Sequence, residues 1–184
     1  MQLALKRKWA VPTWVIEAGG LWLGQHIVVF GLVAAIQLIL LTNGFSLTVG
    51  ASGFPLLGAF LVWDNQWYTH IAQFGYDLPF TSAYPPLYPL LEALLTPLVG
   101  SAAVAGFVIA NVAGLGACLL LRWVLDPVIG ARASQRTLLY LLCFPMAVFF
   151  MAAYTESLFL LLSLAVFAAL QRRAFWWAGL FAGL

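Results

Sequence analysis

Apolar residues in this chain gather into runs of nearly membrane-spanning length, separated by stretches that hold its aromatic and charged residues. A helix that crosses a bilayer needs roughly 20 consecutive apolar residues. A fifth run starts at Ala174 and continues to Leu184, so we expect the sequence to break off inside a membrane helix. The four runs before it predict membrane helices over residues 21–41, 102–121, 137–153 and 157–170.

The third and fourth runs are short, and almost nothing separates them. This spacing predicts a tight hairpin of two tilted helices. Pro145 falls inside the third run and is expected to kink that helix, because proline has no N–H to donate to the preceding turn.

A different pattern lies between the first two runs, in residues 60–74. At about 100° per residue, Phe60, Trp67, Ile71 and Phe74 share one face of a helix. Asp64 falls inside that apolar face. A carboxylate directed toward lipid or protein interior is costly unless it has a partner or a task, so Asp64 is the first candidate for a functional residue.

This helix belongs to a long connection over residues 43–101. Closely spaced prolines in Tyr84-Pro85-Pro86-Leu87-Tyr88-Pro89 favour an extended, stiff path. The following residues, 90–98, are apolar but too short to span, and they are expected to lie along the bilayer surface. The connection is therefore predicted to be an interfacial element that holds Asp64 near the headgroups.

Composition agrees with a membrane protein. Hydrophobic residues make up 64% of the 184 positions and charged residues 8%, against about 25% charged in an ordinary soluble domain. The net charge of +2 gives no indication of nucleic-acid binding. Cys118 and Cys143 lie in apolar runs, which is typical of small buried hydrophobes rather than of a disulfide or a metal pair.

Charge is divided between the two ends of the predicted helices. If the helices alternate in direction, every basic residue lies on one side: Lys6, Arg7, Lys8, Arg122, Arg132, Arg136, Arg172 and Arg173. The other side holds Asp64, Asp77, Glu92 and Glu156 and no Lys or Arg. The positive-inside rule then predicts a cytoplasmic N-terminus and an outward-facing 43–101 connection. The first apolar run is longer than the core of a cleaved signal peptide, so a retained signal anchor is expected.

Two blocks of sequence resemble the PIG-V-like mannosyltransferases. The first block runs from Trp63-Asp64 through Trp67-Tyr68 and Gly75-Tyr76 to Tyr84-Pro85-Pro86-Leu87-Tyr88-Pro89-Leu90. The second runs from Phe144-Pro145 to Tyr154-Thr155-Glu156-Ser157-Leu158-Phe159. The resemblance covers roughly residues 60–184. One departure is visible, because Ala83-Tyr84-Pro85 stands where the family usually has Phe-Phe-Pro.

The resemblance implies the GT-C class of polytopic glycosyltransferases, which use a polyprenyl- or dolichyl-phosphate sugar. It implies an all-α membrane bundle with a long first outer loop, and an N-terminal fragment of a longer enzyme in which residues 1–184 form a single transmembrane domain. Asp64 matches the family's outer-loop acid, whose implied role is that of general base in an inverting transfer. Glu156 matches the acid of the second block, and the implied partners are a lipid-phosphate sugar donor, a glycan or lipid acceptor and membrane lipids.

Each candidate also has a purely structural interpretation. Asp64 could cap a helix, and Glu156 could stabilise the dipole of a helix that begins near Ser157. Aromatic residues commonly line membrane interfaces, but sugar rings also stack on them. The candidate substrate-binding residues are Trp63, Trp67, Tyr68, His70, Tyr84 and Tyr154. No cofactor is certain. A divalent metal on Asp64 and Glu156 is conceivable, although two carboxylates without fixed spacing form a weak metal signature.

Two other functions fit an apolar chain of this kind. A transporter or flippase of a lipid-linked substrate would place its polar residues near mid-membrane in broken helices, whereas these acids lie at helix ends and in the connection. A non-catalytic assembly subunit would tolerate degenerate motifs, yet both blocks are intact. We therefore expect a multi-pass membrane glycosyltransferase that moves mannose or a similar hexose. Its location would be the plasma membrane in a prokaryote or the endoplasmic reticulum in a eukaryote.

Overall fold

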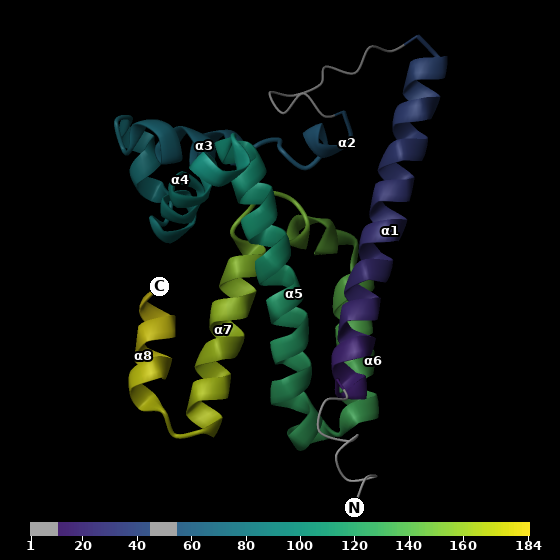
Figure 1. Cartoon of the computed structure of the whole chain (residues 1–184), viewed down its shortest axis with the longest axis vertical. Helices are drawn as coiled ribbons and strands as arrows, with labels where there is room; N and C mark the ends of the chain where they lie inside the picture. The colour runs from purple at the N-terminus through teal and green to yellow at the C-terminus, as the bar shows by residue number, and fades with distance from the viewer. Residues whose placement is uncertain (1–10, 45–54) are drawn as a thin grey trace, which may run out of the picture.

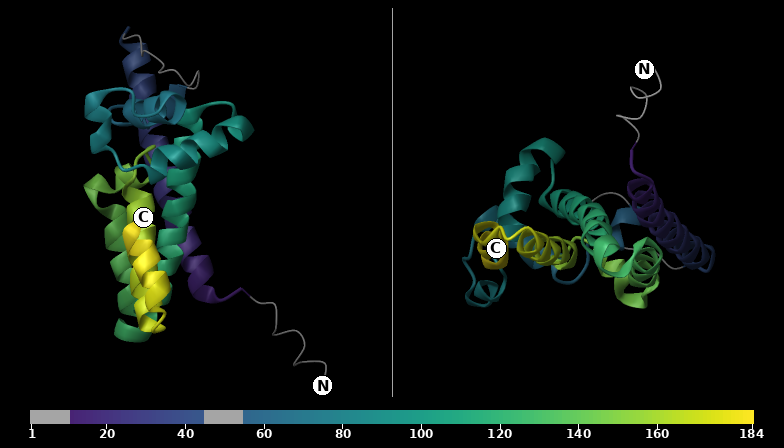
Figure 2. Two further views of the ribbon diagram at one scale, coloured as in Figure 1. Left: turned by 90° about the vertical axis from the view of Figure 1, so that its left-hand side faces the viewer. Right: turned by 90° about the horizontal axis from the view of Figure 1, so that it is seen from below.

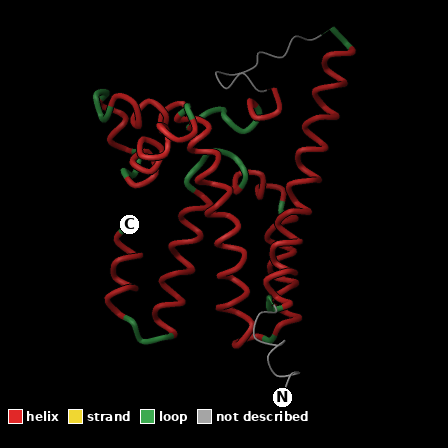
Figure 3. The backbone as a smooth tube through the Cα atoms, in the orientation of Figure 1, coloured by secondary structure: helices red, strands yellow, loops and turns green. Residues whose placement is uncertain are grey.

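The structure, a computed structural model, describes residues 11–44 and 55–184, and its regular elements within those ranges are helical (Figure 3). The basic residues at positions 6–8 lie outside the described residues. In chain order the elements are α1 (Thr13–Thr42), α2 (Pro55–Gly58), α3 (Asn65–Phe74), η2 (Pro79–Ala83), α4 (Leu87–Val99), α5 (Ala102–Ile129), α6 (Ala131–Cys143), η3 (Pro145–Phe150), α7 (Glu156–Gln171) and α8 (Phe175–Gly183); η2 and η3 are 3₁₀ helices.

Within the described ranges two helices are long and apolar enough to cross a membrane, namely α1 with 30 residues and α5 with 28. Both are longer than predicted. Helix α1 begins at Thr13 rather than near residue 21, and α5 continues past Leu121 to Ile129. The extension of α5 is possible because Arg122, which the sequence placed in a connection, pairs with two acids instead of ending the helix.

Helix α5 is the centre of the bundle (Figures 1 and 2). Helix α7 packs on one side of it, α1 and α6 pack on the other, and α8 lies against the outer side of α7. Alanine and glycine are frequent on α5, and such small residues let neighbouring helices approach closely. The central core of buried residues is Ala18, Ala117, Cys118, Leu121, Leu138, Leu142 and Leu164.

The predicted hairpin of the third and fourth helices is wrong. Helix α6 ends at Cys143, and Pro145 opens the 3₁₀ helix η3 rather than kinking a continuous helix. An irregular segment then leads to α7, so the chain passes from one side of α5 to the other. Proline at the start of a helix is favourable because its missing N–H would have no partner there.

The connection between α1 and α5 forms a cap over one end of the bundle. Helices α3 and α4 and the 3₁₀ helix η2 lie at that end (Figure 1). Helix α4 packs on α5, and α3 packs on both α4 and α5. The amphipathic helix in this connection is therefore present, although it begins at Asn65 and not at residue 60.

The predicted faces of that helix are wrong. Its buried residues are Asn65, Tyr68 and Ile71, whereas Phe74 is exposed. Asp64 is exposed as well, so its carboxylate is not turned into an apolar face. Residues 60–64 lie before the helix in turns and irregular structure, so Phe60 and Asp64 do not follow its periodicity. Within α3, packing against α4 and α5 buries the side that carries Tyr68 and leaves Phe74 outside.

Charged residues are divided between the two ends of the bundle as predicted. Among the described residues, the arginines lie near the end of α5, at the start of α6 and in the turn between α7 and α8, which meet at one end in Figure 1. The acidic residues of the cap lie at the opposite end. Two acids, Glu17 and Asp126, share the arginine end and both pair with Arg122.

Polar residues inside α1 hydrogen-bond within the bundle. The Gln25 amide donates to the carbonyls of Leu142 (3.3 Å) and Ala147 (3.2 Å), and His26 Nε2 lies 2.6 Å from the Asn111 side-chain oxygen. Cysteines 118 and 143 are both free, as predicted, but only the first is buried. These contacts tie α1 to α5 and α6 without supplying a ligand site.

Candidate active site

Asp64 is the residue immediately before α3. Its backbone carbonyl accepts hydrogen bonds from the N–H groups of Trp67 (3.0 Å) and Tyr68 (3.2 Å), so the backbone of Asp64 starts the helix. Its carboxylate makes no capping hydrogen bond. Helix capping therefore does not account for the exposed carboxylate, which is available to a ligand.

The residue before it, Trp63, has a backbone that favours glycine. Its φ of 52° lies in the left-handed region, which is unusual for a bulky side chain. Such conformations persist where the surrounding structure imposes them, and they gather at functional sites. The Trp63 ring is 68% exposed and lies 6.2 Å from the ring of Phe149. The sharp turn at Trp63 is what presents Asp64 at the surface.

Three tyrosines, which we call the tyrosine row, lead inward from Asp64. Tyr84 donates a long hydrogen bond to Asp64 Oδ1 at 3.4 Å. The ring of Tyr68 lies 5.0 Å from that of Tyr84 and 5.0 Å from that of Tyr88, both in edge-to-face geometry. The Tyr68 hydroxyl is 3.5 Å from Thr155 Oγ1. The row therefore joins the acid of the first block to the second block.

The phenols of the row are hydrogen-bond donors at neutral pH. Burial raises the pKa of Tyr68, and the negative charges of Glu156 and Asp64 raise it further. Burial and then the charge of Asp64 raise the pKa of Tyr84 in the same way. Both groups keep their protons, so they can donate to an anionic or hydroxyl-bearing substrate.

Two hydrogen bonds hold the second block against the segment that leads to Asp64. The Ala153 N–H donates to the Phe60 carbonyl at 3.0 Å, and the Tyr154 hydroxyl donates to the Val62 carbonyl at 2.7 Å. Tyr154 and Ala153 are both buried. Segments that are far apart in sequence are thus joined directly behind the exposed acid.

Glu156 is the first residue of α7, and it is exposed. A carboxylate in the first turn stabilises the helix dipole, as the structural interpretation requires. Glu156 is also near the other acid: burial raises the pKa of Tyr154 to about 12, and the charges of Asp64 and Glu156 both contribute to that rise. The two acids therefore act on one buried tyrosine from the same end of the bundle.

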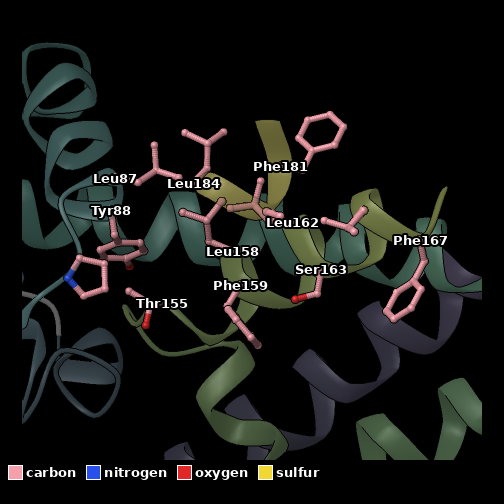
Figure 4. A pocket seen from close by; sticks show the side chains of 13 residues that line it. Leu87, Tyr88, Thr155, Leu158, Phe159, Leu162, Ser163, Phe167, Phe181 and Leu184 are labelled. Carbon is pink, nitrogen blue, oxygen red and sulfur yellow. The ribbon is translucent and has the colours of Figure 1, made fainter. Parts of the chain in front are cut away.

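A groove runs from the tyrosine row along α7. Its cavity of about 410 Å³ has the hydroxyl-bearing residues Tyr88 and Thr155 at one end and apolar side chains along its length (Figure 4). Helix α8 forms the opposite wall. Beyond Thr155 the lining residues include Leu158, Leu162, Ser163, Phe167 and Phe181. The groove is shaped for a long apolar group with a polar end.

A family model described as mannosyltransferase (PIG-V) matches residues 34–183 of the chain. The chain belongs to this family. No curated protein and no solved structure gives a significant match. The match includes both sequence blocks, the cap and the groove. This PIG-V family member is therefore a helical membrane protein and a glycosyltransferase of the mannosyltransferase type.

The other predicted substrate-binding residues of the mannosyltransferase lie in aromatic or ionic contacts. Trp67 packs edge-to-face on Phe80 with the ring centroids 4.6 Å apart. His70 Nε2 lies 2.7 Å from Asp77 Oδ1. That contact gives His70 a structural partner, which favours its structural interpretation. Of the predicted binding residues, Tyr84 contacts the Asp64 carboxylate through its hydroxyl, and the Tyr68 ring packs on the Tyr84 ring.

The site of the mannosyltransferase holds no cation among the described residues, since its arginines lie at the opposite end of the bundle. No group of three His, Cys, Asp or Glu residues converges anywhere in the described ranges. The residues present therefore do not form a dedicated metal centre. Asp64 and Glu156 would supply at most a partial Mg²⁺ site, of the kind that substrate phosphates complete.

Two residues of the site were not identified from the sequence. Thr155 lies next to Glu156 in the second block and contacts Tyr68, but an isolated threonine gives no signal of its own. Tyr88, in the proline-rich segment, was not among the predicted binding residues, yet it is buried and lies at the inner end of the row. Only its packing against Tyr68 reveals that role.

Proposed function

We propose that this family member transfers a mannosyl unit from a polyprenyl- or dolichyl-phosphate donor to a hydroxyl of a glycan or lipid acceptor, with inversion at the anomeric carbon. The observation that carries the proposal is the carboxylate of Asp64. It is exposed, makes no capping bond and lies at the head of the tyrosine row. A base for an acceptor hydroxyl needs such an uncommitted carboxylate within reach of both substrates.

The reaction is a single displacement. Asp64 takes the proton from the acceptor hydroxyl as that oxygen forms a bond to the anomeric carbon. The bond from this carbon to the phosphate oxygen breaks at the same time, and the electron pair leaves with the lipid phosphate. Attack from the face opposite the leaving group inverts the configuration. The lipid phosphate is a good leaving group, so the step requires no strong general acid.

The groove along α7 supports a lipid-linked donor. The isoprenoid chain would lie between α7 and α8, with the phosphate at the end that carries Thr155. There the Thr155 and Tyr68 hydroxyls, 3.5 Å apart, can donate to phosphate oxygens. The sugar would then project past Tyr84 toward Asp64. This arrangement uses the polar end of the groove for charge and its apolar length for the carrier.

Hydroxyl groups alone leave the departing phosphate without a positive charge. In this proposal a divalent ion, bound jointly by the phosphate and the carboxylates of Asp64 and Glu156, would supply that charge. No step of the reaction depends on the ion.

Orientation follows from the division of charge. We place the arginine end of the bundle in the cytoplasm and the cap on the opposite face of a multi-pass GT-C-type bundle. The cap then lies at the membrane surface, where a lipid-linked headgroup is found. The division of acids and arginines between the two ends supports this placement.

The proposal is tested by a transfer assay in membranes that contain the protein. Labelled polyprenyl-phosphate mannose is supplied with and without a chelator, and the anomeric configuration of the product is determined. Transfer with inversion supports the proposal, and loss of transfer on chelation that Mg²⁺ restores assigns the phosphate charge to a metal ion. Use of a nucleotide sugar in place of the lipid donor, or retention of configuration, would contradict it.

Filling the groove should weaken binding of long donors. In Ser163→Trp a large ring replaces a side chain that lines the groove, so we expect KM for a long-chain donor to rise about tenfold, the effect of roughly 1.4 kcal/mol of lost binding. A donor too short to reach position 163 should be unaffected. Val112→Trp, at a 67% exposed position on α5, is the matched control. Equal effects on both donors would show that the carrier lies elsewhere.

A further inference from the structure

Glu92 in α4 is a fully buried acid that the proposed reaction does not use. Its side chain is 0% exposed, and neither carboxyl oxygen has a hydrogen-bond partner in the described part of the chain. A charged carboxylate in that position would be strongly unfavourable. Burial raises the pKa of Glu92 to about 8, so the group is an uncharged acid at neutral pH.

The acid packs against a glycine of α5. A Cβ atom at Gly106 would overlap Glu92 Oε1, so only glycine permits this approach. One turn earlier on α4, the buried Tyr88 hydroxyl donates to the Gly106 carbonyl at 2.8 Å. Glu92 and Tyr88 thus share one face of α4, and that face docks on a single point of α5.

The same contact supports the candidate site. The ring of Tyr88 is 5.0 Å from that of Tyr68, and Tyr68 is 5.0 Å from Tyr84, which contacts Asp64. Movement of α4 away from α5 would withdraw Tyr88 and leave Tyr68 without its inner neighbour. The position of the whole tyrosine row therefore depends on the packing contact between Glu92 and Gly106.

We propose that Glu92 is a positioning residue that acts as an uncharged carboxylic acid. While Glu92 holds its proton, α4 stays packed on α5 and the tyrosine row keeps its position. When Glu92 ionises, α4 separates from α5 at this contact and the tyrosine row becomes less ordered. The catalytic consequence rests on the proposed transfer reaction, whereas the structural consequence does not.

No cation faces the acid to hold its charge. The elements packed on α4 are α5 and α3. Residues 102–117 of α5 have no titratable side chain, and α3 has Tyr68 and His70, the latter bound to Asp77. On α4 itself the neighbour is Tyr88, whose pKa is raised by burial and then by the charge of Glu92. Since these elements offer no cation, Glu92 loses its charge only by binding a proton.

The structural test compares thermal unfolding of wild type and Glu92→Gln across pH. The folded chain keeps this proton up to about pH 8, whereas an exposed glutamate loses it near its ordinary value of 4.5. The stability that the bound proton supplies is complete below about pH 4.5 and is lost as pH rises through about 8. Wild type should lose stability relative to the variant as pH rises, and the difference should level off above pH 8. Asp77→Asn, at an exposed acid, should follow wild type between about pH 7 and about pH 9.

The catalytic test uses the transfer assay over the same range. Above the pKa of Glu92 the protonated fraction falls about tenfold per pH unit, so kcat of wild type should fall while that of Glu92→Gln does not. Glu92→Leu should also lose the pH dependence of stability. If Glu92→Gln does not fold, Glu92→Leu is used in its place. Coincident pH profiles of wild type and the folded variant would overturn the proposal. Diverging stability without any mannosyl transfer would instead contradict the proposed function and leave the positioning role standing.

Discussion

Replacing Asp64 with asparagine should lower kcat for mannosyl transfer by roughly 10²- to 10⁴-fold, the usual contribution of a general base. Asparagine has the same shape and keeps an oxygen that can accept the 3.4 Å hydrogen bond from Tyr84. It has no basic carboxylate to take the acceptor proton. Because the lost interaction develops in the transition state, KM should change little while kcat falls.

Stability provides the first control for this variant. The Asp64 side chain is exposed and makes no capping hydrogen bond, so the variant should accumulate and unfold like wild type. Surface substitutions of this kind usually change stability by less than about 0.5 kcal/mol. Lost activity with unchanged unfolding would therefore report chemistry rather than folding.

Asp77→Asn is the matched control, since Asp77 is a second exposed acid in the same cap, paired with His70 rather than with the tyrosine row. It should retain most of the wild-type rate. Turnover that is unchanged in Asp64→Asn would remove Asp64 from the mechanism, and an equal loss in both variants would indicate a general effect of cap charge.

The second and fourth apolar runs predicted their helices well, because burial in lipid imposes a length and composition that little else does. The third, predicted as one helix over 137–153, spans the end of α6, η3 and an irregular segment. Helix α7, predicted over 157–170, extends from Glu156 to Gln171. The start of α5 at Ala102 was also predicted. The end of α5 was not, because Arg122 was interpreted as the end of a span, and hydropathy does not reveal that a charge is paired.

The environment of Asp64 was predicted from a helix that starts too early. Periodicity relates only residues of one continuous helix, and the left-handed turn at Trp63 separates α3 from Phe60 and the residues that follow it. Which face of α3 is buried depends on its packing against α4 and α5, which periodicity alone does not give. Asp64 stays a predicted site residue, since the motif around it does not depend on that register. The pattern of apolar positions and the family resemblance both selected this residue, and the structure corrected its surroundings.

The contact between the two sequence blocks was not predictable from residue patterns. It depends on the Ala153 N–H and the Tyr154 hydroxyl reaching the carbonyls of Phe60 and Val62. The acceptors are backbone groups, which every residue has, so no side-chain spacing signals the contact. The burial of Glu92 was hidden for a similar reason, because it follows from close packing on Gly106 rather than from the charge pattern.

The largest effect on folding is expected at the arginine end. Arg122 is 1% exposed, and its guanidinium lies 3.1 Å from Glu17 on α1 and 2.9 Å from Asp126 on α5. Arg122→Leu should destabilise the protein by about 3 kcal/mol, because it removes a buried, paired cation and leaves Glu17 and Asp126 without their partner. The estimate is at the low end for such a change, since the two acids are 42% and 22% exposed. Thermal unfolding in detergent measures it.

Neutralising the two acids that have lost their partner should then restore the lost stability. Arg122→Leu combined with Glu17→Gln and Asp126→Asn leaves no unpaired charge, and replacing a whole buried ionic group by neutral residues is often close to neutral. The exposed Arg136, at the same end, is the control, and Arg136→Leu should change stability by less than about 0.5 kcal/mol. If the triple variant were as unstable as Arg122→Leu, the arginine would act through packing of its long side chain rather than through its charge. If Arg122→Leu were as stable as Arg136→Leu, the ion pairs would not hold α1 to α5, and the small residues of the helix interface would be sufficient.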